Sequence, residues 1–215
     1  MRILRADGRA AVPWRNGGGL TREVAAHPPD AGWDAFAWRV SLAEVTRDGP
    51  YSPLPGVRRI LTVVDGGGLE LTVDGAVHRL PGRHRPFAFP GAAATGSRLL
   101  DGPVVNLNVM VREGRMAANV VMVRGSREVP GERTVVVVAV EGETRLGAAG
   151  AGPEEPGVRL GRYDAVVLEP AGQSAGEGTR GAAAPVVVRT EGVAAVIELA
   201  DLPSGDASGA PSGVS

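Results

Sequence analysis

Few side chains in this sequence of 215 residues could carry out chemistry. It contains no cysteine, and all 23 of its Lys/Arg positions are arginine. Disulfides, thiolate metal sites, cysteine nucleophiles, Schiff bases and lysine general bases are therefore excluded. The histidines are His27, His78 and His84. His27 precedes two prolines and the other two flank a Pro-Gly turn, so we expect solvated loop residues. No carboxylate lies at the spacing of a metal site.

The glycine triplet at residues 17–19 could form a phosphate cradle. No Gly-Lys-Ser/Thr follows it and no change from strand to helix is evident, so we expect a plain loop. The formal net charge of −1 argues against a nucleic-acid or acidic-membrane partner. Apolar runs are far shorter than the roughly 20 residues of a spanning helix. With no apolar segment after the N-terminus, we expect a cytoplasmic protein.

The elements that must position these side chains are β-strands. Apolar and polar residues alternate along residues 36–43, 69–73 and 105–111, and Asp74-Gly75 predicts a hairpin turn after the second of these. The β-branched run at 134–140 is typical of a strand covered on both faces. Further predicted strands are residues 58–64, 77–80, 165–169, 186–189 and 193–199. With 32 glycines and 17 prolines between short strands, the sequence predicts an all-β fold.

Residues 59–91 and 133–172 repeat one order of features: a strand, a glycine turn, a hairpin and a closing proline and glycine. We therefore expect two similar half-barrels. The unit resembles a cupin, a small antiparallel barrel that commonly holds a metal with histidines and a glutamate. Aligned on Gly66, the glutamate position falls on Arg59, and no histidine occupies the other ligand positions. Such a site excludes a metal and favours an anion.

The N-terminal half carries several motifs that resemble those of the HutD/Ves family, in the family's order. The matching segments are 14–23 (WRNGGGLTRE), 38–45 (WRVSLAEV), 48–52 (DGPYS), 55–59 (PGVRR), 86–91 (PFAFPG) and 100–110 (LDGPVVNLNVM). The resemblance covers about residues 1–200. It implies a metal-free bicupin without a cofactor, linked to histidine catabolism. It also implies binding of a small metabolite such as N-formylglutamate or urocanate, with no established catalytic reaction.

The chain is expected to divide into two cupin halves, residues 1–112 and 113–202, followed by a disordered tail at 203–215. The tail is too poor in apolar groups to repay the entropy of ordering. Seven of the eight aromatic residues lie before residue 91, within the first half, which also holds the family motifs. We therefore expect the functional site in the first half and a scaffold in the second. Pairing of copies through sheet edges is the expected form of any homodimer.

Arg59 is the central candidate, because a guanidinium inside a barrel needs an anionic partner, either a ligand or an internal carboxylate. Other polar or aromatic residues of the first half are expected to shape a pocket around it. They are Trp14, Asn16, Thr21, Trp38, Asn106 and Asn108. The two asparagines alternate with apolar residues, so they face either the barrel interior or solvent. Glu23 and Arg39 are expected to form a structural ion pair.

Three functions follow from these residues. The leading hypothesis is a regulatory protein that holds a carboxylate or formyl compound through Arg59. The first alternative is a metal-independent isomerase, epimerase or lyase that uses acid/base groups among His78, His84, Glu23 and Tyr51. The second is a pure interaction protein whose half-barrels only present surfaces.

Overall fold

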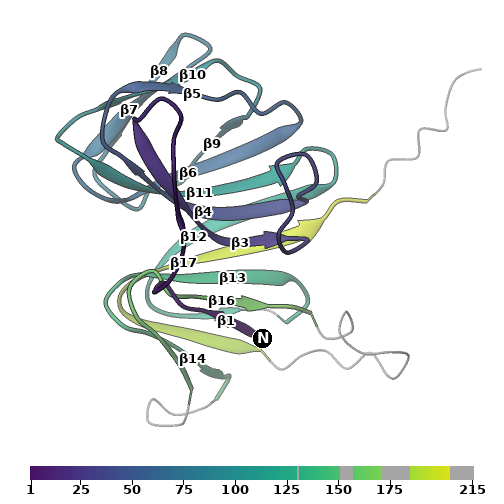
Figure 1. Ribbon diagram of the computed structural model, residues 1–215. Coiled ribbons are helices and arrows are strands. Elements are labelled where there is room, and N and C mark those ends of the chain that lie inside the picture. Colours follow the sequence, from purple (N-terminus) through teal and green to yellow (C-terminus); the bar gives the residue numbers. More distant parts are fainter. Residues whose placement is uncertain (130, 151–156, 171–184, 204–215) are drawn as a thin grey trace, which may run out of the picture.

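A computed structural model describes residues 1–129, 131–150, 157–170 and 185–203, which form strands and turns without any helix (Figure 1). The all-β prediction is confirmed. No helix in this part of the chain is long and apolar enough to cross a membrane. The predicted tail, apart from Pro203, lies outside the described residues.

The strands of these residues form three antiparallel sheets. The six-stranded sheet has the order β2 (Ala11–Pro13), β3 (Gly19–His27), β4 (Trp38–Val45), β11 (Val104–Arg112), β6 (Val57–Asp65) and β9 (Phe87–Pro90). The four-stranded sheet has the order β5 (Gly49–Tyr51), β10 (Thr95–Leu99), β7 (Gly68–Val73) and β8 (Ala76–Pro81). These two sheets form the upper part of the molecule in Figure 1. One apolar core lies between them.

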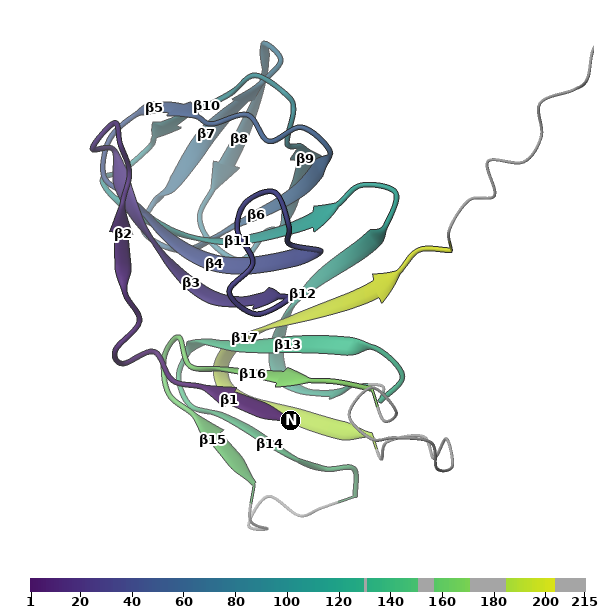
Figure 2. The same ribbon diagram turned by 45° about the vertical axis from the view of Figure 1, so that its right-hand side comes forward.

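The seven-stranded sheet contains most of the chain after residue 112. Its order is β1 (Arg2–Leu4), β16 (Ala165–Leu168), β13 (Thr134–Glu141), β17 (Val186–Asp201), β14 (Thr144–Ala148) and β15 (Val158–Leu160), and β12 (Met116–Val129) pairs with β17. The first strand of the chain thus joins the sheet built by its last strands (Figure 2). Asp164 holds this connection, because it accepts hydrogen bonds from the Arg5 side chain and the Ala6 amide, both at 2.7 Å.

The predicted hairpin forms between β7 and β8. Asp74 and Gly75 both have positive φ, 46° and 83°, as a two-residue type I′ turn requires. The run at 134–140 is β13, and its two faces are buried in different cores. Val136 and Val138 face the six-stranded sheet, whereas Val135 and Val137 pack inside the curl of the seven-stranded sheet. Burial on both faces explains why this strand lacks polar alternation.

Residues 186–189 and 193–199, predicted as separate strands, are parts of the single strand β17. Its first part pairs with β14 and its second with β13, while β12 follows it along its length. Gly192 lies where the strand passes from one partner to the other. A Cβ atom there would lie 2.3 Å from the Glu141 carbonyl oxygen, so glycine permits this close approach instead of ending the strand.

Candidate functional site

The candidate site lies on the face of the six-stranded sheet that is turned toward the four-stranded sheet. Side chains along a strand alternate between faces. On β11, Leu107 and Val109 pack toward the seven-stranded sheet, so Asn106 and Asn108 point to the opposite, inner face. Arg59, on the neighbouring strand β6, is paired in register with Met110 of β11. Met110 lies on the same face as Asn106 and Asn108, so Arg59 shares that face. The structure therefore brings Arg59, Asn106 and Asn108 to one buried face of two adjacent strands.

Arg59 is buried, with 8% of its surface exposed. Among the described residues it makes no ion pair and no hydrogen bond, and its Nε is buried without a partner. Its guanidinium carbon lies 5.2 Å from the ring centroids of both Tyr51 and Phe89. Burial lowers the pKa of Arg59, and the Tyr51 phenol acts in the opposite direction. Two aromatic rings thus flank this cation, and its donors remain open to an anion.

Further buried polar groups lie beside Tyr51, one of the two rings that contact Arg59. The Tyr51 hydroxyl, the Ser97 hydroxyl and both amide atoms of Asn106 are buried, and none of them reaches the geometry of a full hydrogen bond. Burial raises the pKa of Tyr51, while hydrogen-bonding approach of Ser97, the charge of Arg59 and hydrogen-bonding approach of Asn106 oppose this shift. A buried polar group without a partner costs about 1–3 kcal/mol. The cluster offers a cation, two hydroxyls and one amide, which together suit a small polar anion.

Trp14 and Thr21 adjoin this cluster through Tyr51. The Trp14 indole donates a 2.8 Å hydrogen bond to the Thr21 hydroxyl, and its ring meets the Tyr51 ring edge to face at 6.0 Å. β3 and β4 place Thr21 opposite Ala43, and Asn106 is the next partner of Ala43 in the sheet. Trp14 and Thr21 therefore support the ring that flanks the guanidinium.

Two predicted site residues lie away from Arg59. Trp38 is buried on the opposite face of the sheet, where it packs toward the seven-stranded sheet and stacks on His27 with ring centroids 6.0 Å apart. It therefore belongs to the core and does not wall the inner face. Asn16 closes the glycine turn, since its side-chain oxygen accepts a 2.9 Å hydrogen bond from the Gly18 amide. Its role is local.

The predicted pair of Glu23 and Arg39 is confirmed, with a separation of 2.7 Å between Arg39 Nη2 and Glu23 Oε2. Arg39 also lies 4.3 Å from the ring centroid of Trp33. This pair occupies the inner face near the edge of the sheet, where Arg39 is in register with Met110 and Met110 in turn with Arg59. Arg39 has its carboxylate partner, whereas Arg59 has none among the described residues.

Sequence reasoning missed Ser97 and Phe89 as members of the cluster. Phe89 is directly opposite Arg59 on β9, and it lies in the segment 86–91 that resembles the family. Ser97 comes from β10 of the other sheet, in register with Gly49 and Leu71. Its alternation with Thr95 was the available signal, but only the pairing of β10 with β5 inside the four-stranded sheet places its hydroxyl near Tyr51.

The acid/base groups of the enzyme hypothesis do not converge. His78 packs on Phe87 with centroids 4.6 Å apart, Glu23 pairs with Arg39, and Tyr51 alone flanks Arg59. His84 was expected to be solvated, but only 8% of its side chain is exposed, because residues of the seven-stranded sheet cover it. Within the described ranges, no three His, Asp or Glu side chains form a group that could hold a metal ion.

Comparison with known proteins gives consistent matches. The family model HutD matches residues 6–184. The uncharacterized 21.2 kDa protein in the hutC 3' region of Pseudomonas putida is 34% identical over 79% of this chain and 87% of the relative. Protein Ves of Citrobacter koseri is 37% identical over 62% of this chain and 70% of the relative.

Solved structures agree with these matches. HutD from Pseudomonas fluorescens SBW25, described as a formate condition, has a TM-score of 0.76 and 30% identity. The match covers 94% of this chain and 98% of that one. A cupin 2 conserved barrel domain protein from Leptotrichia buccalis has a TM-score of 0.51 at 11% identity, covering 86% and 89% of the two chains, and shows similarity of fold alone.

Proposed function

The chain belongs to the HutD family, and from this premise we propose that it is a regulatory protein that binds a small carboxylate or formyl metabolite of histidine utilisation. The link to this pathway is supported by the Pseudomonas putida relative from the hutC 3' region. N-formylglutamate and urocanate are the ligands that the family resemblance suggests. The ligand would bind on the inner face of the six-stranded sheet.

The observation that supports this proposal most strongly is the isolated charge of Arg59. An ionised group in a protein interior is costly unless it is paired. Arg59 has aromatic contacts but no carboxylate among the described residues. A carboxylate ligand would supply the missing charge, and its two oxygens match the planar fork of a guanidinium.

The neighbouring groups support a ligand with more than one polar atom. The Asn106 amide presents one acceptor and one donor group, neither of which makes a full hydrogen bond, and it approaches the Tyr51 hydroxyl. The Tyr51 and Ser97 hydroxyls can each donate or accept. A formyl or amide oxygen next to a carboxylate would pair with these groups. A similar protein, the HutD of Pseudomonas fluorescens, carries the description of a formate condition, and formate is a minimal fragment of such a ligand.

We also propose that the two curled regions are cupin halves, with the division near residue 112. The described residues contain one core between the six- and four-stranded sheets and a second inside the curl of the seven-stranded sheet. The second core is made of Val, Leu and Ala and, unlike the first, has no cluster of unpaired polar atoms. This difference supports ligand binding in the first half and a scaffold role for the second. β1, which belongs to the first half by sequence, pairs with β16 of the second half and so connects the two.

The proposed activity is binding rather than turnover. Acid/base chemistry needs at least one titratable group within reach of the proton that it transfers. Of the titratable side chains in the described residues, Tyr51 is the one in contact with the Arg59 guanidinium, and burial raises its pKa further above neutrality.

The proposal is tested by thermal-shift and calorimetric titration of the full chain with formate, N-formylglutamate and urocanate. We expect at least one of them to stabilise the wild-type protein and to lose its effect in Arg59→Gln. The matched control is Arg58→Gln, at the exposed residue that precedes Arg59 on the same strand. Absence of stabilisation by all three compounds, or equal stabilisation in Arg59→Gln, would contradict ligand recognition at Arg59.

A further inference from the structure

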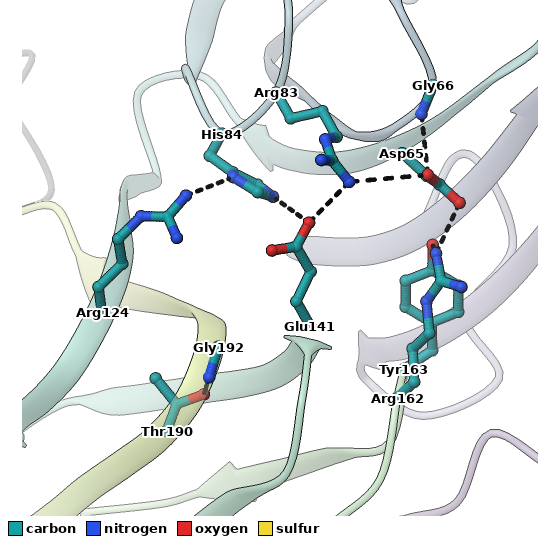
Figure 3. A network of polar contacts seen from close by, with 10 residues as sticks. All are labelled: Asp65, Gly66, Arg83, His84, Arg124, Glu141, Arg162, Tyr163, Thr190 and Gly192. Atoms are coloured by element: carbon teal, nitrogen blue, oxygen red, sulfur yellow. Dashed lines mark hydrogen bonds and ion pairs between the residues drawn. The ribbon is translucent and has the colours of Figure 1, made fainter.

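A series of charged side chains connects the region of the six- and four-stranded sheets with the seven-stranded sheet (Figure 3). Arg83 Nη1 lies 2.7 Å from Glu141 Oε1 and 3.9 Å from Asp65 Oδ1. Arg162 contacts the same Asp65 from the other side, at 2.6 Å. His84 belongs to this series and lies between Glu141 and Arg124. Residues of the β6–β9 region thus meet residues of β12, β13 and the turn after β15.

The contact with Arg124 favours the neutral form of His84. Arg124 Nη2 lies 3.1 Å from His84 Nδ1. A guanidinium has only donors, so this contact is a hydrogen bond when the imidazole is neutral, accepts at Nδ1 and carries its proton on Nε2. Nε2 is 3.6 Å from Glu141 Oε1, is buried and has no hydrogen bond. The histidine thus lies between a cation and a carboxylate (Figure 3).

Charged groups approach His84 from every neighbouring element. Arg83 precedes it in its own loop, Arg124 comes from β12 and Glu141 from the end of β13. Asp65 and Arg162 lie behind Arg83. Glu141 already pairs with Arg83, so it is only partly available to an imidazolium. A second proton on His84 would enter at Nδ1, directly against the Arg124 guanidinium. Burial lowers the pKa of His84, Arg124 and Arg83 lower it further, and Glu141 opposes them.

His84 is also connected to the candidate site through the backbone. Its amide donates a 2.8 Å hydrogen bond to the carbonyl oxygen of Val63, and Val63 is the register partner of Asn106. β9 begins three residues later and brings Phe89 to Arg59. The backbone of His84 has φ of 70°, a conformation that is unfavourable for residues other than glycine. The contacts of the imidazole therefore help to hold the loop that leads into the site.

We propose that His84 is a pH-sensitive joint between the sheets, at which protonation breaks the contact with Arg124 and loosens the loop at 82–86 and the adjoining β9. The consequence for the site rests on the proposed function: release of Phe89 would weaken anion binding at Arg59. The joint itself does not depend on any ligand. Acidification below the ordinary pKa of histidine would thus reduce ligand affinity.

The sign of the effect follows from proton binding. The neutral form is favoured in the folded state, so the unfolded or opened state binds more protons over this range. The contribution of His84 to stability is complete above the unfolded pKa, near 6.5, and is lost as the pH falls toward the lowered folded pKa. The state in which the contact between His84 and Arg124 is broken therefore becomes more populated as the pH falls below neutrality.

The test is amide hydrogen exchange of the full chain without ligand, measured at about pH 7.5 and about pH 5.5 and corrected for intrinsic exchange rates, which spans the histidine range. We expect residues 82–90 to exchange severalfold faster at the lower pH in the wild type. His84→Asn is expected to abolish this pH response, and His27→Asn, at a histidine that stacks on Trp38 of β4, is expected to retain it. An unchanged response in His84→Asn would overturn the proposal.

A second measurement uses the unmodified protein, in case His84→Asn does not fold. NMR titration of the imidazole C–H signals should give His84 a midpoint below 6.5, the ordinary value of histidine. A midpoint at or above that value, together with pH-independent exchange at 82–90, would overturn the joint.

Formate titration at both pH values separates the two proposals, because formate remains ionised throughout. PH-dependent exchange without formate binding supports the joint and contradicts the binding function. Formate binding through Arg59 without pH-dependent exchange supports the binding function and contradicts the joint.

Discussion

The Arg59 guanidinium carbon lies 5.2 Å from the ring centroid of Phe89, its direct partner across β6 and β9. Tyr51 of the four-stranded sheet is at the same distance. The two rings attract the cation through their π faces, and they use none of its hydrogen-bond donors. This arrangement keeps a buried arginine in place and leaves its planar fork available.

Arg59→Met is expected to raise the stability of the ligand-free protein. The substitution removes an unpaired buried charge and keeps an apolar side chain between the two rings. We expect a gain of about 1–4 kcal/mol in the free energy of unfolding, by analogy with buried ion pairs that are replaced by apolar residues. Chemical denaturation measures this change, with the exposed Arg58→Met as control. A loss of stability would show that Arg59 serves the fold.

Trp14→Phe should weaken the support of the Tyr51 ring. The variant keeps an aromatic ring near Tyr51 but loses the hydrogen bond from the indole to Thr21. A loss of about 0.5–1.5 kcal/mol in unfolding free energy is expected for one such bond. If ligand binding depends on the position of Tyr51, formate affinity measured by calorimetry should fall as well. Thr21→Val should reproduce both effects, and a difference between the variants would argue against the shared bond as their cause.

Gly192→Ala is expected to destabilise the bend of β17. The new Cβ would lie 2.3 Å from the Glu141 carbonyl oxygen, and both atoms belong to paired strands that cannot move apart freely. We expect a cost of about 1–3 kcal/mol, typical of overpacking in a dense region. Thermal unfolding measures it. Gly32→Ala is the control, because no atom lies within 4 Å of its added Cβ and its φ is ordinary. Equal stability of both variants would contradict the close approach.

Asp164→Asn should lower the free energy of unfolding at neutral pH and make it less dependent on pH in the acid range. Burial would raise the pKa of Asp164, but hydrogen bonds from Ala6, Arg5 and Gly161 lower it overall. The stabilisation is therefore complete above the unfolded pKa, near 3.8, and disappears as the pH falls through the lowered folded pKa. At neutral pH we expect a loss of about 1–3 kcal/mol, since hydrogen bonds to a charged group are involved.

The measurement for Asp164→Asn is urea denaturation at a series of pH values from neutrality to acid. The difference between wild type and variant should shrink toward zero as Asp164 becomes protonated. Asp7→Asn, a carboxylate near the same strand with no contact to Asp164, serves as control. A constant difference at all pH values would mean that the charge of Asp164 does not secure β1.

Much of the strand structure could be predicted from local pattern. The run of residues 134–140 indicated burial on both faces, and the Asp74-Gly75 pair indicated the hairpin, because both depend on neighbouring residues and on allowed backbone angles. The same local reasoning divided β17 into two strands. The close approach of Gly192 to Glu141, where the strand bends, comes from a distant part of the chain.

For the candidate site, the sequence by itself determined that Asn106 and Asn108 share one face of a strand, because side chains alternate with a period of two. It also singled out Arg59. Only the tertiary structure decided that this face is interior, that Trp38 lies on the other face, that Ser97 joins the cluster and that His84 is buried. These facts depend on which sheets pack together, and that is decided by contacts between residues far apart in the chain, which no local pattern contains.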